Sequence, residues 1–276
     1  MTSAVAWKGG WRQGLSYGGL ALPLAFVALP LYVLLPNHYA SVYGLPLAAL
    51  GALLLGARLV DALADPWIGR WVDHLLNRDA APPTVLMLVA AGLLAAGFHG
   101  LFFAPVRGTA ALLAWCGALL LLTYLSYSLL TVLHQAWGAR LGGNAVQRAR
   151  IVSWREGLAL VGVLVASVLP SLAGLSVASA VFALALLAGL VLLRSAPRAL
   201  PLPPGPAPSW SAPLATPDFR RLLAVYLLNG IASAVPATLL LFFIRDRLQA
   251  PQFEPLFLVA YFAAGALSMP LWVVLV

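Results

Sequence analysis

Long apolar stretches separated by short polar segments run through the whole chain. A helix that rises about 1.5 Å per residue needs about 20 apolar residues to cross about 30 Å of hydrocarbon. Within lipid only helices and closed barrels satisfy their own backbone, and none of these stretches shows the alternation of a strand, so the pattern predicts an all-α, polytopic membrane helix bundle. Eight stretches reach about the required length, at approximately 15–35, 45–64, 84–104, 110–133, 157–175, 177–193, 222–244 and 256–276.

Prolines occur inside the predicted spans and, more densely, between two of them. Between 195 and 217, eight prolines exclude a continuous helix and favour extended polyproline geometry, which predicts a linker; an ordinary long loop is the alternative. The predicted organisation is a six-helix transmembrane half at 1–194, a Pro-rich cytoplasmic linker at 195–217 and two helices of a second half at 218–276. Four further helices are expected in the natural product, unless the gene is truncated. Kinks are predicted inside spans at Pro23, Pro30, Pro170, Pro236 and Pro270.

Basic residues gather at one set of alternating span ends. Of the sixteen, twelve lie there, three lie at the opposite ends and Arg58 lies within a span. Because loops rich in Lys and Arg stay in the cytoplasm, the N terminus and the loops after the second, fourth and sixth spans are predicted to be cytoplasmic, in a cytoplasmic (inner) membrane. The twelve are Lys8, Arg12, Arg70, Arg78, Arg140, Arg148, Arg150, Arg155, Arg194, Arg198, Arg220 and Arg221, and the three are Arg107, Arg245 and Arg247.

Composition excludes several other classes of protein. Apolar residues make up 62% of the chain, charged residues 9%, and the mean hydropathy is +0.95, so water cannot be the main solvent. The net charge of +8 is spread over short loops without an aromatic-interleaved basic surface, so no nucleic-acid partner is expected. No metal-spaced His/Glu set, Gly-rich phosphate loop or Ser/His/Asp grouping occurs, so neither enzyme activity nor a cofactor is expected.

The second predicted span carries three charges on one face. Arg58, Asp61 and Asp65 are spaced i, i+3 and i+7, which puts the two carboxylates one helical turn apart. A charge near mid-bilayer costs about 2.5 to 3.5 kcal/mol on insertion scales, so these side chains are expected to face the bundle interior. Two such carboxylates cannot both ionise cheaply without a cation between them, which predicts a coupling-ion site for H⁺ or Na⁺. The alternative is that Arg58 simply neutralises one Asp near the cytoplasmic end of the span.

This segment resembles the second-helix signature of the glycoside, pentoside and hexuronide:cation symporters, the melibiose permease group of the major facilitator superfamily. It reads Arg58-x-x-Asp61-Ala-x-x-Asp65-Pro66-x-x-Gly69-x-x-x-Asp73. The resemblance covers essentially the whole chain and implies a major-facilitator-type bundle that carries out cation-coupled symport. Further matches are Leu15-Ser16-Tyr17-Gly18, the spacing of Arg148 and Arg155, and Phe219-Arg220-Arg221-Leu222-Leu223.

The same resemblance implies a cation site on the second and fourth spans. It gives the coupling role to the acidic pair, with Na⁺ as the only metal implied, and adds a hydroxyl of the fourth span. Three departures argue against a galactoside-like solute or a standard site: Ala64 stands where Asn is frequent, Ala25 where melibiose-type members have a sugar-binding carboxylate, and Thr131 near a second such position. The expected cation-site residues are Asp61, Asp65, Arg58, Ser128 and Thr131.

The fourth span is unusually polar and is expected to line a solute cavity. Tyr124, Tyr127 and Gln135 are the candidate cavity residues, with Arg155 at the start of the fifth span. Aromatic faces can stack on a sugar, and polar side chains can hydrogen-bond its hydroxyls. The alternatives are that these side chains hold helices together, as His134 and His99 are expected to do, and that Arg155 is a positive-inside anchor.

We therefore expect a secondary active transporter that moves a small polar solute with H⁺ or Na⁺ by alternating access. A sugar or glycoside is the favoured solute, and the expected partners are this solute, the coupling cation and the lipid bilayer. One rival is a lipid or lysolipid transporter of the same fold, which the scarcity of charge in the cavity favours. The other is a truncated membrane protein that does not transport.

A cysteine introduced next to Arg148 is predicted to be protected from a membrane-impermeant thiol reagent in intact cells and to react in inside-out vesicles. The reason is the excess of Lys and Arg at this set of span ends. Labelling in both preparations measures the side directly. Reaction from outside intact cells would show that the orientation is reversed.

Overall fold

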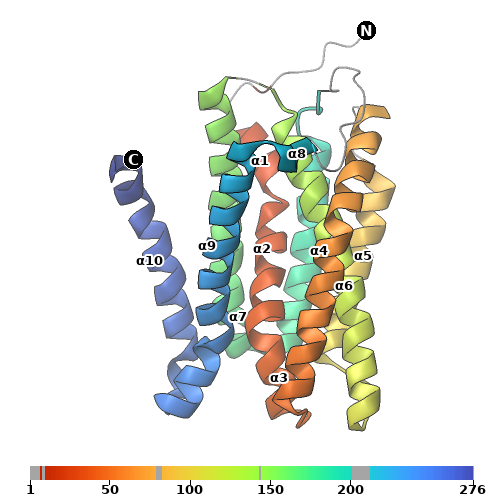
Figure 1. Ribbon diagram of the computed structural model, residues 1–276, viewed down its shortest axis with the longest axis vertical. Helices are drawn as coiled ribbons and strands as arrows, with labels where there is room; N and C mark the ends of the chain where they lie inside the picture. The colour runs from red at the N-terminus through yellow and green to blue at the C-terminus, as the bar shows by residue number, and fades with distance from the viewer. Residues whose placement is uncertain (1–6, 8–9, 79–82, 143, 201–211, 276) are drawn as a thin grey trace.

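Helices make up all the regular secondary structure in the described part of the chain, which comprises residues 7, 10–78, 83–142, 144–200 and 212–275 of the computed structural model (Figure 1). The all-helical prediction is confirmed for these residues. The elements are α1 Trp11–Gly18, α2 Ala21–Leu29, the π-helical η1 Pro30–Leu34, α3 Leu35–Ser41, α4 Leu47–Arg78, α5 Thr84–Phe102, α6 Thr109–Ala139, α7 Ala145–Arg194, α8 Ala212–Ala215, α9 Pro217–Phe242, η2 Phe243–Arg247, the 3₁₀ turn η3 Pro251–Phe253 and α10 Glu254–Leu275.

Six helical stretches in the described residues are long and apolar enough to cross a membrane. They are Trp11–Ser41, which joins α1 to α3, then Leu47–Asn77, Thr84–Phe102, Thr109–Ala139, Ala145–Arg194 and Pro217–Arg247. The predicted spans at 157–175 and 177–193 both fall within α7, and the predicted span at 256–276 falls within α10 apart from residue 276, which lies outside the description. The helices Trp11–Ser41, Leu47–Asn77, Thr109–Ala139 and Pro217–Arg247 are longer than the apolar runs that predicted them, because polar end turns continue the helix, whereas α5 ends at Phe102, two residues before the predicted end.

Helix α7 contains a reversal of the chain. It begins where Asn144 and Gln147 form a capping box, each side chain bonded to the other residue's backbone N–H at 3.0 Å. Its helical geometry breaks at Gly174, with φ 83° and ψ 165°, a conformation open essentially only to glycine. Trp154, before Gly174, lies against Gly18, and Leu192, after it, lies against the adjacent Gly19. The two parts of α7 therefore contact the same turn of the first span, so the chain reverses its direction between them. These two arms correspond to the fifth and sixth predicted spans.

Glycines allow the first span to approach both arms of α7 closely. A Cβ at Gly162 would collide with the backbone carbonyl of Leu22, and one at Gly189 would lie 2.9 Å from the Cα of Leu20. Small residues at such crossings let helix backbones come together, which is the main source of packing energy between helices in lipid. The aromatic rings of α2, α5 and α7 continue this core, since Phe182 packs on both Phe26 and Phe98 with ring centroids 5.9 and 5.0 Å apart.

The connections alternate between two ends of the bundle (Figure 1). At one end, the Trp137 indole donates to the carbonyl of Pro197 at 2.9 Å, and the Leu200 N–H donates to the carbonyl of Arg140 at 2.7 Å. At the opposite end, the His38 ring and the Tyr43 hydroxyl both bond the carbonyl of Phe102. Residues 196–200, at the start of the predicted linker, are therefore packed onto α6; residues 201–211 of that linker lie outside the described residues.

Replacing Gly162 by Ala is predicted to destabilise the protein by about 1–3 kcal/mol, because the new methyl group meets backbone that cannot move aside. The midpoint of thermal unfolding in detergent measures the effect. Gly157→Ala on the same arm is the matched control, since nothing lies within 4 Å of a Cβ there, and it should be neutral or stabilising by up to about 1 kcal/mol. Equal midpoints for the two variants would refute this account of the crossing.

Candidate functional site

The carboxylate of Asp61 lies buried between α4 and α6 with both oxygens occupied. Ser128 Oγ donates to Oδ1 at 2.9 Å, and the Arg58 Nη1 donates a longer bond to Oδ2 at 3.4 Å. The Asp61 side chain is only 9% exposed, against 40% for Arg58. A carboxylate at such depth is strongly destabilising unless it is paired and hydrogen-bonded, and both conditions are met here. The structure thus brings together Asp61, Arg58 and Ser128 as one cluster.

The guanidinium of Arg58 is held by two tyrosine rings. Its Cζ lies 4.0 Å from the ring centroid of Tyr32 and 4.5 Å from that of Tyr124. Such contacts stabilise a cation through the negative faces of the rings and leave its N–H edges free to donate. Tyr32 lies in the π-helical segment that begins at Pro30, so the predicted proline distortion occurs there and carries a site residue. The sequence analysis missed Tyr32; an isolated tyrosine in the middle of an apolar first span was the available signal.

The second carboxylate of the motif has a different environment. Asp65 is exposed, and no hydrogen bond joins it to another described residue, although it remains within electrostatic reach of Asp61. Pro66 follows it inside α4, which continues as a helix on both sides. The predicted pair is therefore one buried carboxylate and one accessible carboxylate, a turn apart.

Thr131 adds an oxygen close to the cluster along α6. Its Oγ1 is buried and has no hydrogen-bond partner among the described residues. Buried hydroxyls normally have a partner, so this atom stands out within the described part of α6. Ser128 and Thr131 are three residues apart on one helix and share a face. Asp61 and Ser128 are joined by a hydrogen bond, and Thr131 lies on the same face of α6 as Ser128; that these oxygens bind a cation stays a prediction.

Two cavities flank this cluster. The Arg58 cavity, of about 690 Å³, is lined by Leu31, Tyr32, Pro36, Gly51, Leu54, Leu55, Arg58, Tyr124, Gly230, Ser233 and Ala234. The Arg155 cavity, of about 460 Å³, is lined by Gly69, Asp73, Val132, Gln135, Ala136, Ala139 and Arg155. The predicted cavity residues are thus divided, with Tyr124 in the first and Gln135 and Arg155 in the second, while Tyr127 lines neither. Asp61 lies on α4 between the positions that line the two.

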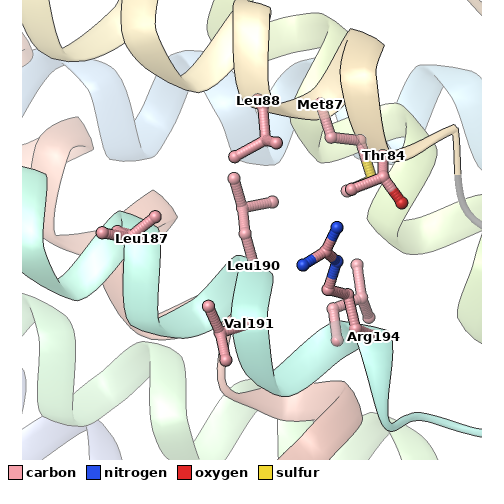
Figure 2. Close-up of a pocket in the computed structure, with 8 residues that line it drawn as sticks. Thr84, Met87, Leu88, Leu187, Leu190, Val191 and Arg194 are labelled. Carbon is pink, nitrogen blue, oxygen red and sulfur yellow. The ribbon is translucent and has the colours of Figure 1, made fainter.

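A third hollow lies apart from the predicted site residues. It is a groove of about 200 Å³ between α5 and α7 (Figure 2), lined by Thr84, Met87, Leu88, Leu187, Leu190, Val191, Leu193 and Arg194. Its walls are mostly apolar, with the Thr84 hydroxyl and the Arg194 guanidinium at one end. None of the predicted cation or cavity residues lines it, so the groove does not belong to the candidate site.

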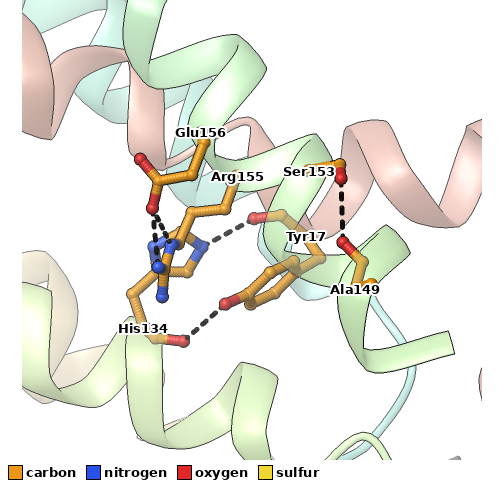
Figure 3. A network of polar contacts seen from close by, with 6 residues as sticks. All are labelled: Tyr17, His134, Ala149, Ser153, Arg155 and Glu156. Atoms are coloured by element: carbon orange, nitrogen blue, oxygen red, sulfur yellow. Dashed lines mark hydrogen bonds and ion pairs between the residues drawn. The ribbon is translucent and has the colours of Figure 1, made fainter. Parts of the chain in front are cut away.

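His134 cross-links the first span to α6 (Figure 3). Its Nε2 donates to the backbone carbonyl of Tyr17 at 2.8 Å, and the Tyr17 hydroxyl donates to the backbone carbonyl of His134 at 3.2 Å. The two rings lie 4.5 Å apart, and a Cβ at Gly138 would collide with the Tyr17 hydroxyl. His134 therefore packs the helices together, as expected of it. Arg155 donates to the adjacent Glu156 at 2.6 Å and lies at the edge of its cavity.

A family model described as MFS/sugar transport protein matches residues 14–196. The chain belongs to this family. It is a family of transporters rather than of enzymes, and it implies an integral membrane protein with a major-facilitator-type fold. The buried cluster and both arms of α7 lie within the matched region.

Two curated bacterial symporters also match parts of this family member. The uncharacterized symporter YnaJ of Bacillus subtilis (strain 168) is 39% identical over 67 residues, which cover 24% of this chain and 14% of that protein. The inner membrane symporter YicJ of Escherichia coli (strain K12) is 25% identical over 169 residues, which cover 57% of this chain and 34% of that protein. The chain therefore matches about a third or less of the length of either relative.

The family member also carries an ion pair where α4 and α6 end together. Arg140 donates to Asp73 at 2.6 Å and to the amide oxygen of Asn77 at 2.8 Å, and its side chain is only 4% exposed. Asp73 ends the charged motif of the second span, and sequence reasoning did not connect it with Arg140, since the two are far apart along the chain. The pair ties together the helices that hold Asp61 and Ser128.

Asp73→Ala is predicted to lower the stability by about 1–2 kcal/mol, because it leaves the buried Arg140 guanidinium with Asn77 as its remaining side-chain partner; the exposure of Asp73 limits the loss. Thermal unfolding in detergent measures it. Glu156→Ala, which removes the more exposed pair with Arg155, is the control and should change the midpoint little. A lower unfolding midpoint for Glu156→Ala but not for Asp73→Ala would contradict the stabilising role of the Arg140–Asp73 pair.

Proposed function

We propose that this protein is a cation-coupled symporter that moves a small polar solute, of the sugar or glycoside kind, by alternating access. The observation that carries the proposal is the buried Asp61 carboxylate, shared between Ser128 and Arg58 in an otherwise apolar helix pair. Membership of the transporter family and the two matched relatives, which are named as symporters, support the same class. In this proposal residues 1–194 are the first six-helix half, 195–217 the linker and 218–276 part of the second half.

Asp61 is the proposed coupling group. Binding of a cation there neutralises the carboxylate and replaces the Arg58 bond to Oδ2, while the exposed Asp65 receives and releases the ion. Asp61 is placed on α4 between the positions that line the Arg58 cavity and those that line the Arg155 cavity. A cation site between two cavities is the arrangement that alternating access requires, since each cavity opens in turn.

The coupling ion in this proposal is H⁺. Na⁺ binds best to several oxygen ligands, and Ala64 contributes none beside Asp65, whereas a proton needs a single carboxylate. Both oxygens of Asp61 already accept hydrogen bonds, which a protonated carboxyl can reorganise by donating through its own hydroxyl. The proposal puts the N terminus in the cytoplasm, which the distribution of Lys and Arg supports.

The polar solute is assigned to the Arg155 cavity. Gln135 and Arg155 supply hydrogen-bond donors to hydroxyls there, and Tyr127 lies on the same helix as the cation oxygens. The second candidate is a lipid or lysolipid transporter of the same fold. The mostly apolar wall of the Arg58 cavity, which includes Leu31, Leu54 and Leu55, favours it.

Asp61→Asn in the protein expressed from its own gene is predicted to abolish uphill uptake and to retain some solute exchange. The neutral amide resembles the protonated carboxyl but cannot release a proton, so the solute site forms without coupling. Asp65→Asn should do the same less completely, because Asp65 is exposed. Uptake and counterflow of radiolabelled sugars in proteoliposomes measure the two activities. Full uphill uptake by Asp61→Asn would refute the assignment.

Solute-driven alkalinisation outside the same proteoliposomes, measured with and without Na⁺, separates the two ions. We expect proton movement that needs no Na⁺. An absolute requirement for Na⁺ without proton movement would overturn the choice of H⁺. The coupling role of Asp61 would then be tested by the Asp61→Asn uptake measurement alone. An increase in the thermal unfolding midpoint with lysolipids instead of sugars would favour the second candidate, a lipid or lysolipid transporter.

A further inference from the structure

The Arg58 cavity holds a cation against an apolar wall. Its volume of about 690 Å³ lies within the range of roughly 300–1,000 Å³ that is typical of small-molecule sites. Residues from η1, α3, α4, α6 and α9 line it, so both sides of the Pro-rich linker contribute. Arg58 is the charged side chain among these lining residues, and Tyr32, Tyr124 and Ser233 supply hydroxyls. A ligand that fits this wall is largely apolar and carries a group that accepts hydrogen bonds from a guanidinium.

The position of Arg58 suits an anion in the cavity. The two tyrosine rings hold the guanidinium at 4.0 and 4.5 Å, which fixes its plane and leaves its N–H edges for other partners. One of those N–H groups bonds Asp61 at the long distance of 3.4 Å, and the side chain is 40% exposed. Asp61, at 9% exposed, lies behind it. A planar, preorganised guanidinium of this kind matches a carboxylate, which it can bind through two parallel hydrogen bonds.

The charge on Asp61 determines whether Arg58 attracts an anion. The charged or titratable groups that face Asp61 are Arg58 and Asp65 on α4, Tyr32 on η1, and Tyr124 and Tyr127 on α6. While Asp61 is ionised, its charge compensates Arg58 and repels a second carboxylate. Once a proton or Na⁺ neutralises Asp61, the guanidinium is left uncompensated at membrane depth, which is unfavourable, and an anionic ligand restores the balance.

We propose that the Arg58 cavity binds an organic carboxylate with an apolar body, and that Arg58 exchanges Asp61 for the ligand carboxylate when the coupling cation binds. Cation and anion binding then strengthen each other, and by thermodynamic reciprocity each raises the affinity for the other by the same factor. The inference rests on the proposed cation coupling at Asp61 and adds a second ligand, in a cavity other than the one assigned to the polar solute. It also gives Arg58 a role in binding a ligand, whereas the alternative is that Arg58 only neutralises Asp61.

The test compares ligands that differ only in charge or in apolar surface. The probes are 2-naphthoate, its neutral amide 2-naphthamide, and galacturonate, a carboxylate with a polar body. Binding to the purified full chain in lipid nanodiscs is measured by titration calorimetry. We expect 2-naphthoate to bind about tenfold or more tightly than either of the others, since a charge-assisted bidentate pair and apolar burial are both needed. Equal affinity for the naphthoate and the amide would overturn the role of the cation, and equal affinity for galacturonate would overturn the apolar body.

Substitutions then assign the effect to named side chains. Arg58→Gln should remove the preference for 2-naphthoate over the amide while keeping the affinity for the amide. Asp61→Asn should increase the affinity for 2-naphthoate about tenfold or more, because the competing carboxylate is gone. Arg107→Gln, in the exposed connection between α5 and α6, is the control for loss of a positive charge and should change neither affinity. An unchanged naphthoate affinity in Asp61→Asn would overturn the exchange at Arg58.

Ser233→Leu keeps the test decisive if Arg58 variants do not fold. The larger side chain fills the α9 wall of the cavity without touching the charged cluster, so binding of both naphthoate and amide should be lost together. Retained binding of both would place the ligand elsewhere and overturn the proposal. Failure of the proposed symport can be distinguished from failure of this inference. Failure of symport would appear as uptake without ion coupling in both the wild type and Asp61→Asn, whereas the calorimetric titrations report ligand binding alone.

Discussion

The burial of one negative charge inside an apolar helix pair is the constraint on which the described site depends. Asp61 can remain between α4 and α6 only because Ser128 donates to one oxygen and Arg58 to the other. Arg58 is itself a charge at membrane depth, and the rings of Tyr32 and Tyr124 stabilise it. Three helical segments, η1, α4 and α6, are thus linked through a single carboxylate, so a change in its charge affects every contact in the set.

The helices around the Asp61 cluster are packed tightly against one another. The first span is locked to both arms of α7 by glycine crossings at Gly162 and Gly189, and to α6 by the reciprocal bonds of Tyr17 and His134. The ends of α4 and α6 are joined by Arg140 and Asp73. Interlocked helices of this kind move as one body, because close packing resists gradual deformation.

The two carboxylates of the motif differ in their exposure. Asp61 is enclosed and hydrogen-bonded, whereas Asp65 is exposed one turn further along the same helix. In the proposed symport, an enclosed group next to an accessible one would give the coupling ion a direction of entry. The contrast arises from α6, which covers the Asp61 side of α4 with Ser128 and leaves Asp65 uncovered.

The sequence by itself determined the solvent, the class of fold and the charged motif of this transporter-family chain, because hydrophobic length, the placement of Lys and Arg, and i, i+3, i+7 spacing are local properties. It also pointed to Arg58, Asp61 and Ser128. It did not reveal Tyr32, the link between Asp73 and Arg140, the division of the cavity residues between two hollows, or the different burial of Asp61 and Asp65. Those features depend on which helix faces cover one another. In lipid every face of a span is apolar, so hydrophobicity does not mark the inward face, and only the tertiary packing of small residues and polar partners decides it.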